Sequence, residues 1–428
     1  MYSMFDADAW ESLDEMFSAA AAYLKKGQTD AAIGLLREIL RRDPQHVGAH
    51  ITLARALQVA GQAEVALTHL SDAIRTLPEE ASLHMAQGDV LGDIGHHDMA
   101  IREYQRALEI TPNYAEAYHR IGMAHQKRGR LEAALTAYND AIRLQPDFAD
   151  AYVNLGVALQ QTGRVREAWL AYDEALHGDP EHAGAHYALG ILLEELGHLD
   201  EARRHLREAV RLSPRFTEAR QTLGDLLNAK GELEAAIEEY KEVLRQDKRN
   251  VPARCSLATV FFKKGLLDNA LAQLQEALRI NPQNAEAHHD LGAVLFLKGD
   301  PEQGMAELHE AIRLDPKHAW AHFNLGVALS QTGQYGQALH YYQQAIQLDP
   351  QHVGAHFDMA NAFYKRGQAY DAMRQYERTL KIDPHHKWAH FNLGGLARHP
   401  DRGFAALEQY AQTTRLHQGV TSRLFQMP

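Results

Sequence analysis

The sequence predicts an all-α solenoid, a single stack of short helix–turn–helix repeats. Three observations carry this prediction: a 34-residue period, a glycine that recurs once per period, and a proline that recurs in a second register. The glycine slot is filled in eleven consecutive repeats, from Gly27 to Gly367, and the proline slot, from Pro44 to Pro384, is broken only by Lys248. Such a period is typical of chains whose repeats bury apolar surface only on their neighbours.

The stretch Ala319–His352 represents one repeat. Its first helix has an inward stripe at i, i+3, i+4 and i+7, formed by His322, Leu325, Gly326 and Leu329. Gly333 is expected to end this helix in the left-handed conformation. The second helix should bury Leu339, Tyr342 and Ile346, with Ala338 and Ala345 as small contact residues, before Asp349-Pro350 ends it.

These residues resemble the tetratricopeptide repeat family. The match consists of the glycine in Asn324-Leu325-Gly326, the alanines Ala338 and Ala345, and the closing Asp349-Pro350. The resemblance implies about twelve helix–turn–helix repeats wound into a right-handed superhelix. It also implies that the first helices line a concave groove.

Taken in order, the chain divides into four parts. Residues 1–12 are expected to form an N-terminal capping segment, in which Met4, Phe5 and Trp10 pack on the first repeat. Residues 13–386 make eleven repeats, with a seam near residues 247–252, where Lys248 replaces proline. Residues 387–415 form an atypical twelfth repeat that acts as a C-terminal cap. Residues 416–428 are a tail that either packs on this cap or acts as a ligand-like peptide for a groove.

The composition of the chain narrows the classes of partner that it is expected to bind. The chain has 44 Lys and Arg against 56 Asp and Glu, a formal net charge of −12, so no nucleic-acid partner is expected. A basic stretch spans residues 203–264, and it is either a solvated helix face or a docking site for an acidic partner segment. No apolar run is long enough for a membrane span. The acidic start lacks a secretory pattern and Cys255 is the single cysteine, so we expect a cytoplasmic protein.

The first helices carry a second stripe, opposite the inward one and rich in aromatic rings, amides and carboxylates. Rings supply desolvation energy, and amides can bond a peptide backbone. We therefore expect a protein or extended peptide partner in the groove of the C-terminal repeats. The candidate contact residues are Asp290, Phe296, Trp320, Phe323, Asn324, Phe357, Asp358, Asn361, Tyr364, Trp388, Phe391 and Asn392. The alternative is that the rings only pack between adjacent first helices.

One slot of this stripe holds Asn154, Asn324 and Asn392, with Asp290 and Asp358 between them. This arrangement is similar to the asparagine ladder in the repeat region of O-linked N-acetylglucosamine transferase, which holds peptide backbones. The ladder is incomplete, and too few residues follow the last repeat in this sequence for the catalytic domain of that enzyme. The resemblance therefore concerns the repeats alone.

Five H-x3-H pairs begin repeats: His46/His50, His182/His186, His318/His322, His352/His356 and His386/His390. Histidines four apart on a helix can share a metal, but packed imidazoles bonded to neighbouring turns are the preferred interpretation. No nucleophile or phosphate-binding motif occurs in a usable context, so neither enzyme activity nor a cofactor is expected. The sequence thus favours a non-catalytic protein-interaction scaffold. A self-assembling homo-oligomer and a metal-binding protein using the H-x3-H pairs are the alternatives.

Overall fold

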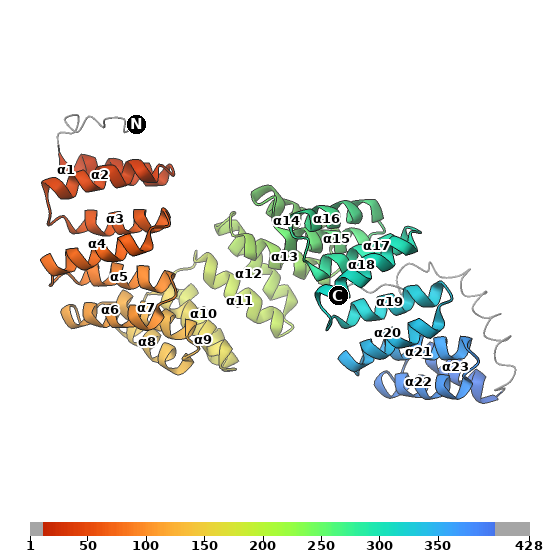
Figure 1. The fold of residues 1–428 in the computed structure, drawn as a ribbon. Coiled ribbons are helices and arrows are strands. Elements are labelled where there is room, and N and C mark those ends of the chain that lie inside the picture. The colour runs from red at the N-terminus through yellow and green to blue at the C-terminus, as the bar shows by residue number, and fades with distance from the viewer. Residues whose placement is uncertain (1–11, 399–428) are drawn as a thin grey trace, which may run out of the picture. The chain divides into compact units, whose positions relative to one another are not determined.

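The computed structural model of the protein describes residues 12–398, which contain 23 α-helices and no strand (Figure 1). The first twelve helices are α1 Leu13–Lys25, α2 Thr29–Arg42, α3 Val47–Val59, α4 Ala63–Thr76, α5 Ala81–Asp93, α6 His97–Ile110, α7 Ala115–Lys127, α8 Leu131–Leu144, α9 Ala149–Gln161, α10 Val165–Gly178, α11 Ala183–Glu195 and α12 Leu199–Leu212. The remaining helices are α13 Thr217–Ala229, α14 Leu233–Gln246, α15 Val251–Lys263, α16 Leu267–Ile280, α17 Ala285–Leu297, α18 Pro301–Leu314, α19 Ala319–Gln331, α20 Tyr335–Leu348, α21 Val353–Lys365, α22 Ala369–Ile382 and α23 Lys387–Arg398. The predicted all-α solenoid is confirmed.

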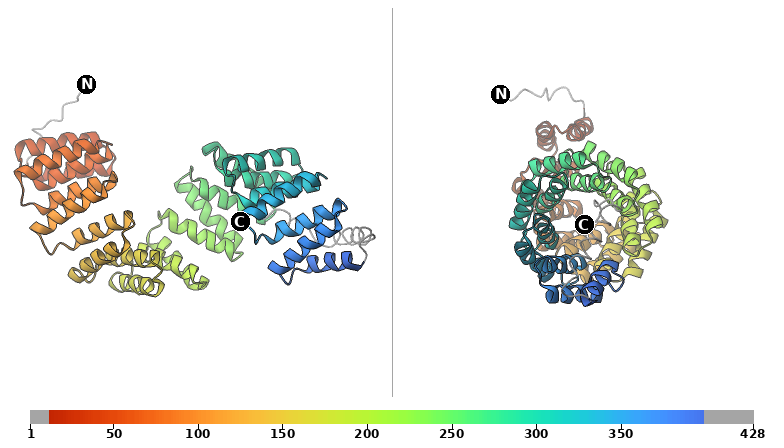
Figure 2. Two further views of the ribbon diagram at one scale, coloured as in Figure 1. Left: turned by 60° about the horizontal axis from the view of Figure 1, so that its bottom comes forward. Right: turned by 90° about the vertical axis from the view of Figure 1, so that its right-hand side faces the viewer.

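The chain divides into two compact bodies between Pro214 and Arg215, and each is built in the same way. Odd-numbered helices are the first helices of the repeats and even-numbered helices are the second. Within each body a helix packs on its neighbours in sequence, as Figures 1 and 2 show, and first helices also contact the first helix of the next repeat, for example α3 with α5 and α17 with α19. The seam expected near residues 247–252 stays a prediction.

Two glycine slots shape the repeat. The glycine after each first helix adopts positive φ, between +70° at Gly129 and +89° at Gly299, as the sequence pattern predicted. In five repeats the glycine inside the first helix lies against a tyrosine ring of the second, and at Gly190 and Gly292 it lies against a leucine. A Cβ at Gly326 would stand 2.7 Å from the Tyr342 ring, so only glycine allows this approach.

An aspartate side chain supports several of the turns between repeats. Asp349 Oδ1 accepts the backbone N–H of Gln351 at 3.0 Å. At Lys248, where the proline is missing, Asp247 Oδ1 accepts the N–H of Arg249 at 2.8 Å in the same way. The side-chain bond therefore maintains the turn where the proline register is interrupted.

The core follows the predicted stripes. Ala338 and Ala345 are fully buried, and the ring of Tyr342 is 1% exposed. The hydroxyl of this tyrosine donates to Ser330 Oγ at 3.1 Å, so the buried polar atom is satisfied. Buried tyrosines at the same slot, such as Tyr138, also donate to a polar group on their first helix.

The ends of the described stretch agree with the repeat boundaries. Ser12 caps α1 by accepting the N–H of Glu15 at 3.2 Å, and α23 begins at Lys387. The expected contacts of Met4, Phe5 and Trp10, the second helix of the twelfth repeat and the tail lie outside the described residues. None of the described helices is long and apolar enough to cross a membrane.

Candidate partner-binding surface

Three of the twelve expected contact residues are buried inside the C-terminal body. Asp290 is 2% exposed, Phe323 3% and Asn324 0%. This corrects the expectation of an open stripe at these positions, because their side chains fill the spaces between neighbouring helices. Here the alternative interpretation, packing between adjacent first helices, describes the structure better.

Phe323 belongs to an aromatic cluster that joins two repeats. Its ring centroid lies 4.6 Å from that of His352 and 6.0 Å from that of Tyr342. Trp320 contacts the same imidazole at 4.4 Å and meets Phe323 edge to face at 5.8 Å. Trp320 remains partly exposed at the rim of the cluster.

The amide of Asn324 holds a histidine of the preceding repeat. Asn324 Nδ2 lies 2.7 Å from His289 Nε2, and His289 Nδ1 lies 3.1 Å from Asp290 Oδ1. Burial raises the pKa of the Asp290 carboxyl, and the bond from His289 opposes that rise. The same pairing joins Asn154 to His119 at 2.7 Å in the N-terminal body. These asparagines thus connect first helices, and Asn324 is buried between them.

The surface is more open on α21 and α23. Asn361 is the centre of a polar group: its Nδ2 donates to Asp358 at 3.1 Å, and its Oδ1 accepts from the Tyr376 hydroxyl at 2.6 Å. Asn392 Nδ2 also points at this pair, 3.1 Å from the Tyr376 hydroxyl oxygen and 3.3 Å from Asn361 Oδ1. Asp358, Asn361 and Asn392 are all partly exposed. We call Asp358, Asn361, Tyr376 and Asn392 the Asn361 cluster.

Burial raises the pKa of the Asp358 carboxyl to about 6, against the opposing bond from Asn361. Aromatic rings flank the cluster. Phe357 packs on His386 at 4.7 Å, and Phe391 is 42% exposed. Trp388 meets Phe391 edge to face at 6.5 Å, whereas Phe296 and Tyr364 are partly buried.

The first histidine of each H-x3-H pair caps a first helix. The Nδ1 atoms of His46, His182, His318, His352 and His386 each accept the backbone N–H three residues later, at 3.0 to 3.1 Å. The second histidine donates Nε2–H to the carbonyl of the preceding proline, as His50 does to Pro44 at 2.9 Å. The preferred structural interpretation of these pairs is therefore supported, since the two rings of a pair serve different bonds.

A recurrent bond between first and second helices was not anticipated. Position i of the first helix bonds position i+19: His50 Nδ1 to His69 Nε2 at 3.1 Å, His186 to His205 at 3.0 Å, and Arg220 to Glu239 at 2.7 Å. The signal in the sequence was a polar residue 19 positions after each polar residue of this slot.

Among residues 12–398 one group of three potential metal ligands comes together, formed by Glu286, His289 and His318. His318 uses both ring nitrogens, because Nδ1 accepts the N–H of Ala321 and Nε2–H donates to Glu286 Oε2 at 2.9 Å. Binding a metal through Nε2 would cost that ring proton or the helix cap. The arrangement fits a hydrogen-bonded cluster better than a metal centre.

Comparison with known proteins agrees with this architecture. Models described as "TPR repeat" match residues 88–129, 127–163 and 258–299, and models described as "Tetratricopeptide repeat" match residues 23–90, 187–251, 285–318 and 319–352. The chain belongs to the tetratricopeptide repeat family. Such repeats are typically non-catalytic scaffolds that mediate protein–protein interactions. No curated protein sequence matches the chain.

Three solved structures are similar to this chain to different degrees. The structure of the APC/C hetero-tetramer Cut9-Hcn1 has a TM-score of 0.50 at 17% identity, covering 90% of this chain and 96% of that chain. YrrB, described as a TPR protein with an unusual peptide-binding site, has a TM-score of 0.39 at 24% identity over 44% of this chain and 96% of its own. MamA has a TM-score of 0.34 at 26% identity over 39% and 92%.

Within this tetratricopeptide chain, much of the basic stretch 203–264 is neutralised locally. Arg211 bonds Glu208 at 2.6 Å, and Lys264 bonds Glu234 at 2.6 Å. Cys255 lies close to the buried carboxyl of Asp290. Burial raises the pKa of its thiol to about 12, with the charges of Asp290 and Glu286 adding to the rise, so the thiolate is scarce at neutral pH.

Proposed function

We propose that this tetratricopeptide protein is a non-catalytic scaffold that binds an extended segment of a protein partner on the first-helix face of α21 and α23. The observation that carries the proposal is the Asn361 cluster, in which partly exposed amide and carboxyl groups lie on the buried Tyr376 hydroxyl, together with the exposed ring of Phe391.

The cluster leaves acceptors for a peptide backbone. Asp358 Oδ1 is bonded by Asn361, while Asp358 Oδ2 and Asn392 Oδ1 have no donor among residues 12–398. An extended peptide could donate main-chain N–H groups to these oxygens, whatever its side chains. Phe391, Phe357 and Trp388 would supply apolar contact area at little rotamer cost. Asn392 would then act as the asparagine ladder of O-linked N-acetylglucosamine transferase does.

The proposal excludes the buried members of the stripe from direct contact. Asp290, Phe323 and Asn324 would support the surface from below, whereas Trp320, Phe296 and Tyr364 would lie along the path of a longer segment. A cytoplasmic location remains part of the proposal, in line with the single cysteine of the chain.

The test begins with peptides selected on the immobilised full-length chain from a random display library. Binding of the selected peptides is then measured by fluorescence anisotropy to the wild type, Phe391→Ala and Asn392→Ala. Each variant should bind at least about tenfold more weakly, equivalent to about 1.4 kcal/mol. Tyr370→Ala removes an aromatic ring that is 75% exposed on α22 and is the matched control.

Circular dichroism must show that all three variants are folded like the wild type. Peptides that bind the three variants and the wild type equally would place the binding surface elsewhere and refute the proposal. If selection enriches nothing and light scattering shows a mass that grows with concentration, self-assembly into a homo-oligomer becomes the function to pursue.

A further inference from the structure

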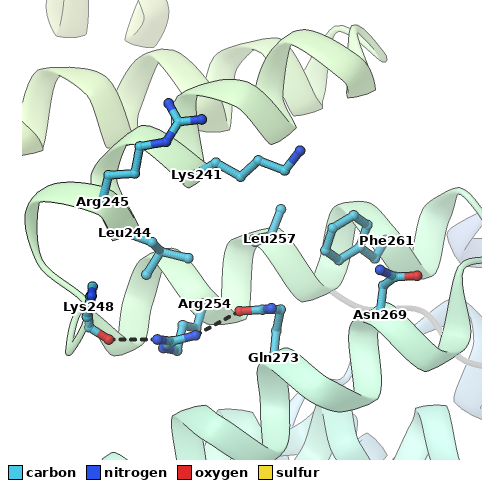
Figure 3. A pocket seen from close by; sticks show the side chains of 9 residues that line it. All are labelled: Lys241, Leu244, Arg245, Lys248, Arg254, Leu257, Phe261, Asn269 and Gln273. Atoms are coloured by element: carbon cyan, nitrogen blue, oxygen red, sulfur yellow. Dashed lines mark hydrogen bonds between the residues drawn. The ribbon is translucent and has the colours of Figure 1, made fainter.

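A hollow on the second-helix side of the C-terminal body combines positive charge with an apolar floor. It has a volume of about 440 Å³ and lies between α14, α15 and α16 (Figure 3). Its lining residues are Lys241, Leu244, Arg245, Lys248, Arg254, Leu257, Phe261, Asn269 and Gln273. Four of these are cationic and none is acidic. We call this hollow the α14–α16 groove.

The Arg254 guanidinium donates its hydrogen bonds only to neutral oxygens. Its two terminal nitrogens donate to Gln273 Oε1 at 2.9 Å and to the backbone carbonyl of Lys248 at 2.7 Å, as Figure 3 shows. Arg254 Nε is buried and has no acceptor among the described residues. One repeat earlier the equivalent arginine, Arg220, bonds a carboxylate, Glu239, at 2.7 Å. Because Gln273 stands where Glu239 stands one repeat earlier, Arg254 lacks the carboxylate that neutralises Arg220.

Lys248 adds a second cation that its neighbours lack. It stands in the slot that holds proline in the other repeats, and its ammonium group has no acceptor in the part of the chain that the structure describes. Lys241 and Arg245 line the same hollow from α14 but are bonded on that helix by Glu238 and Glu242. On α16, the nearby Glu276 is bonded by Arg279, and its charge also interacts with that of Arg254. Glu238, Glu242 and Glu276 thus each have a hydrogen-bonded cation on their own helix.

The floor of the groove is apolar. Leu244, Leu257 and Phe261 are its apolar lining residues, and Figure 3 shows Leu257 and Phe261 on α15 beyond Arg254. An inorganic anion would use the cations but leave this floor in water. A ligand that matches the whole surface carries carboxylates beside an aromatic or aliphatic side chain.

We propose that the α14–α16 groove docks an acidic segment of a partner protein, with an apolar side chain of that segment on Leu257 and Phe261. Its carboxylates would pair with Arg254 and Lys248, where charge is least neutralised. In a chain of net charge −12 a locally cationic hollow attracts such a segment selectively, and the attraction weakens as salt rises. This surface differs from the Asn361 cluster, so either site can fail without the other.

The chain itself suggests variants that change the charge and keep the fold. Lys248→Pro restores the residue of the equivalent repeats, and Gln273→Glu restores the carboxylate found at Glu239 and Glu307. Arg313→Gln is the matched control. Arg313 occupies on α18 the slot that Arg245 occupies on α14, lies outside the groove, and is replaced by Gln347 in the next repeat.

The probe is a fluorescein-labelled peptide of Asp and Glu around one Phe, titrated with the full-length chain and followed by anisotropy. We expect Lys248→Pro and Gln273→Glu each to weaken binding by about tenfold, a loss that shrinks at high salt, while Arg313→Gln binds as the wild type does. A peptide with Ser in place of Phe should bind more weakly than the probe.

Four results would overturn the proposal. Equal binding by the wild type, Lys248→Pro and Gln273→Glu would exclude the groove, and an equal loss in Arg313→Gln would reduce the effect to overall charge. Displacement of the probe by inorganic phosphate at similar concentration would indicate a simple anion site. The last competitor is a synthetic peptide of residues 1–11, which is itself acidic and aromatic. If this peptide binds much more tightly than the probe, the occupant of the groove is a second copy of this chain and not a partner protein.

Discussion

Gly122 shows how a single missing carbon sets the distance between two helices. A Cβ at this position of α7 would lie 2.5 Å from the ring of Tyr138 on α8, closer than unstrained carbon atoms approach. The buried ring cannot move away easily, because its hydroxyl donates to Gln126 at 2.7 Å. Glycine lowers the helix propensity of α7, and the close packing of Tyr138 offsets that cost.

Gly122→Ala is therefore expected to lower the free energy of unfolding, by about 1–3 kcal/mol, although alanine favours helix. Gly34→Ala is the matched change in α2, where nothing lies within 4 Å of the added carbon. It should instead raise stability, by about 0.5–1 kcal/mol. Urea unfolding followed by circular dichroism measures both. The steric argument is wrong if the two variants shift stability in the same direction.

At the scale of one helix, a side-chain cap sets the start of many first helices, although α5, α7, α9 and α13 have none. Histidine is not among the residues that most often cap helices, yet His182 accepts the N–H of Ala185 through Nδ1 at 3.0 Å. In the same slot Asn250 and Asn284 accept the N–H of Ala253 and Ala287 at 2.9 Å. The two residue types present an acceptor at the same place.

His182→Ala should cost about 1 kcal/mol of stability, because the backbone donor of α11 loses its acceptor. His182→Asn should stay within a few tenths of a kcal/mol of the wild type at neutral pH, since asparagine performs this task in α15 and α17. Thermal unfolding at pH 7.5 compares the three proteins. An equal loss in both variants would show that the Nε2 contact of His182 with Asp150 matters more than the cap.

The order and type of the helices were predictable because their signals are local. Gly333 ends one helix and Asp349-Pro350 the next, and neither signal depends on residues far along the chain.

The candidate surface was predictable only in part. The stripe pattern places Asn324 and Asn392 on one face alike, but whether the face is open depends on the residue 35 positions earlier. His289 fills that position for Asn324, whereas Asn392 reaches only Asn361 and Tyr376.

Across the whole molecule, the histidines make folding stability depend on pH. His69 and His205 lie on second helices and donate to histidines of the first helices. Burial, followed by the neighbouring His50, lowers the pKa of His69 to about 4. Burial and then His186 lower the pKa of His205, and burial lowers that of His352. In the folded chain each of these histidines is therefore a neutral imidazole.

The sign of the effect follows from these shifts. A histidine whose pKa is lower in the folded chain than its ordinary value, about 6.5, binds protons more readily when the chain is unfolded. Its stabilising contribution is complete above that value and is lost as pH falls toward the folded pKa. His318 acts in the opposite direction: burial lowers its pKa, but the bond to Glu286 together with the charges of Glu286, Asp315 and Asp290 outweighs burial, and the net shift is upward. More of these histidines have a lowered pKa than a raised one, so acid should destabilise the molecule.

The melting temperature of the wild type should accordingly be flat from pH 8 to pH 7 and fall by several degrees as pH drops from about 6.5 toward 4, with His69 contributing up to about 3 kcal/mol. The double variant His69→Tyr/His205→Tyr removes two of these imidazoles. It copies the tenth repeat, in which Tyr341 stands beside His322 with ring centroids 6.1 Å apart. Its melting temperature should decline less steeply over the same range, although its value at pH 7.5 is close to that of the wild type. Parallel decline of the two proteins would assign the acid sensitivity to the helix-capping histidines or to the carboxylates instead.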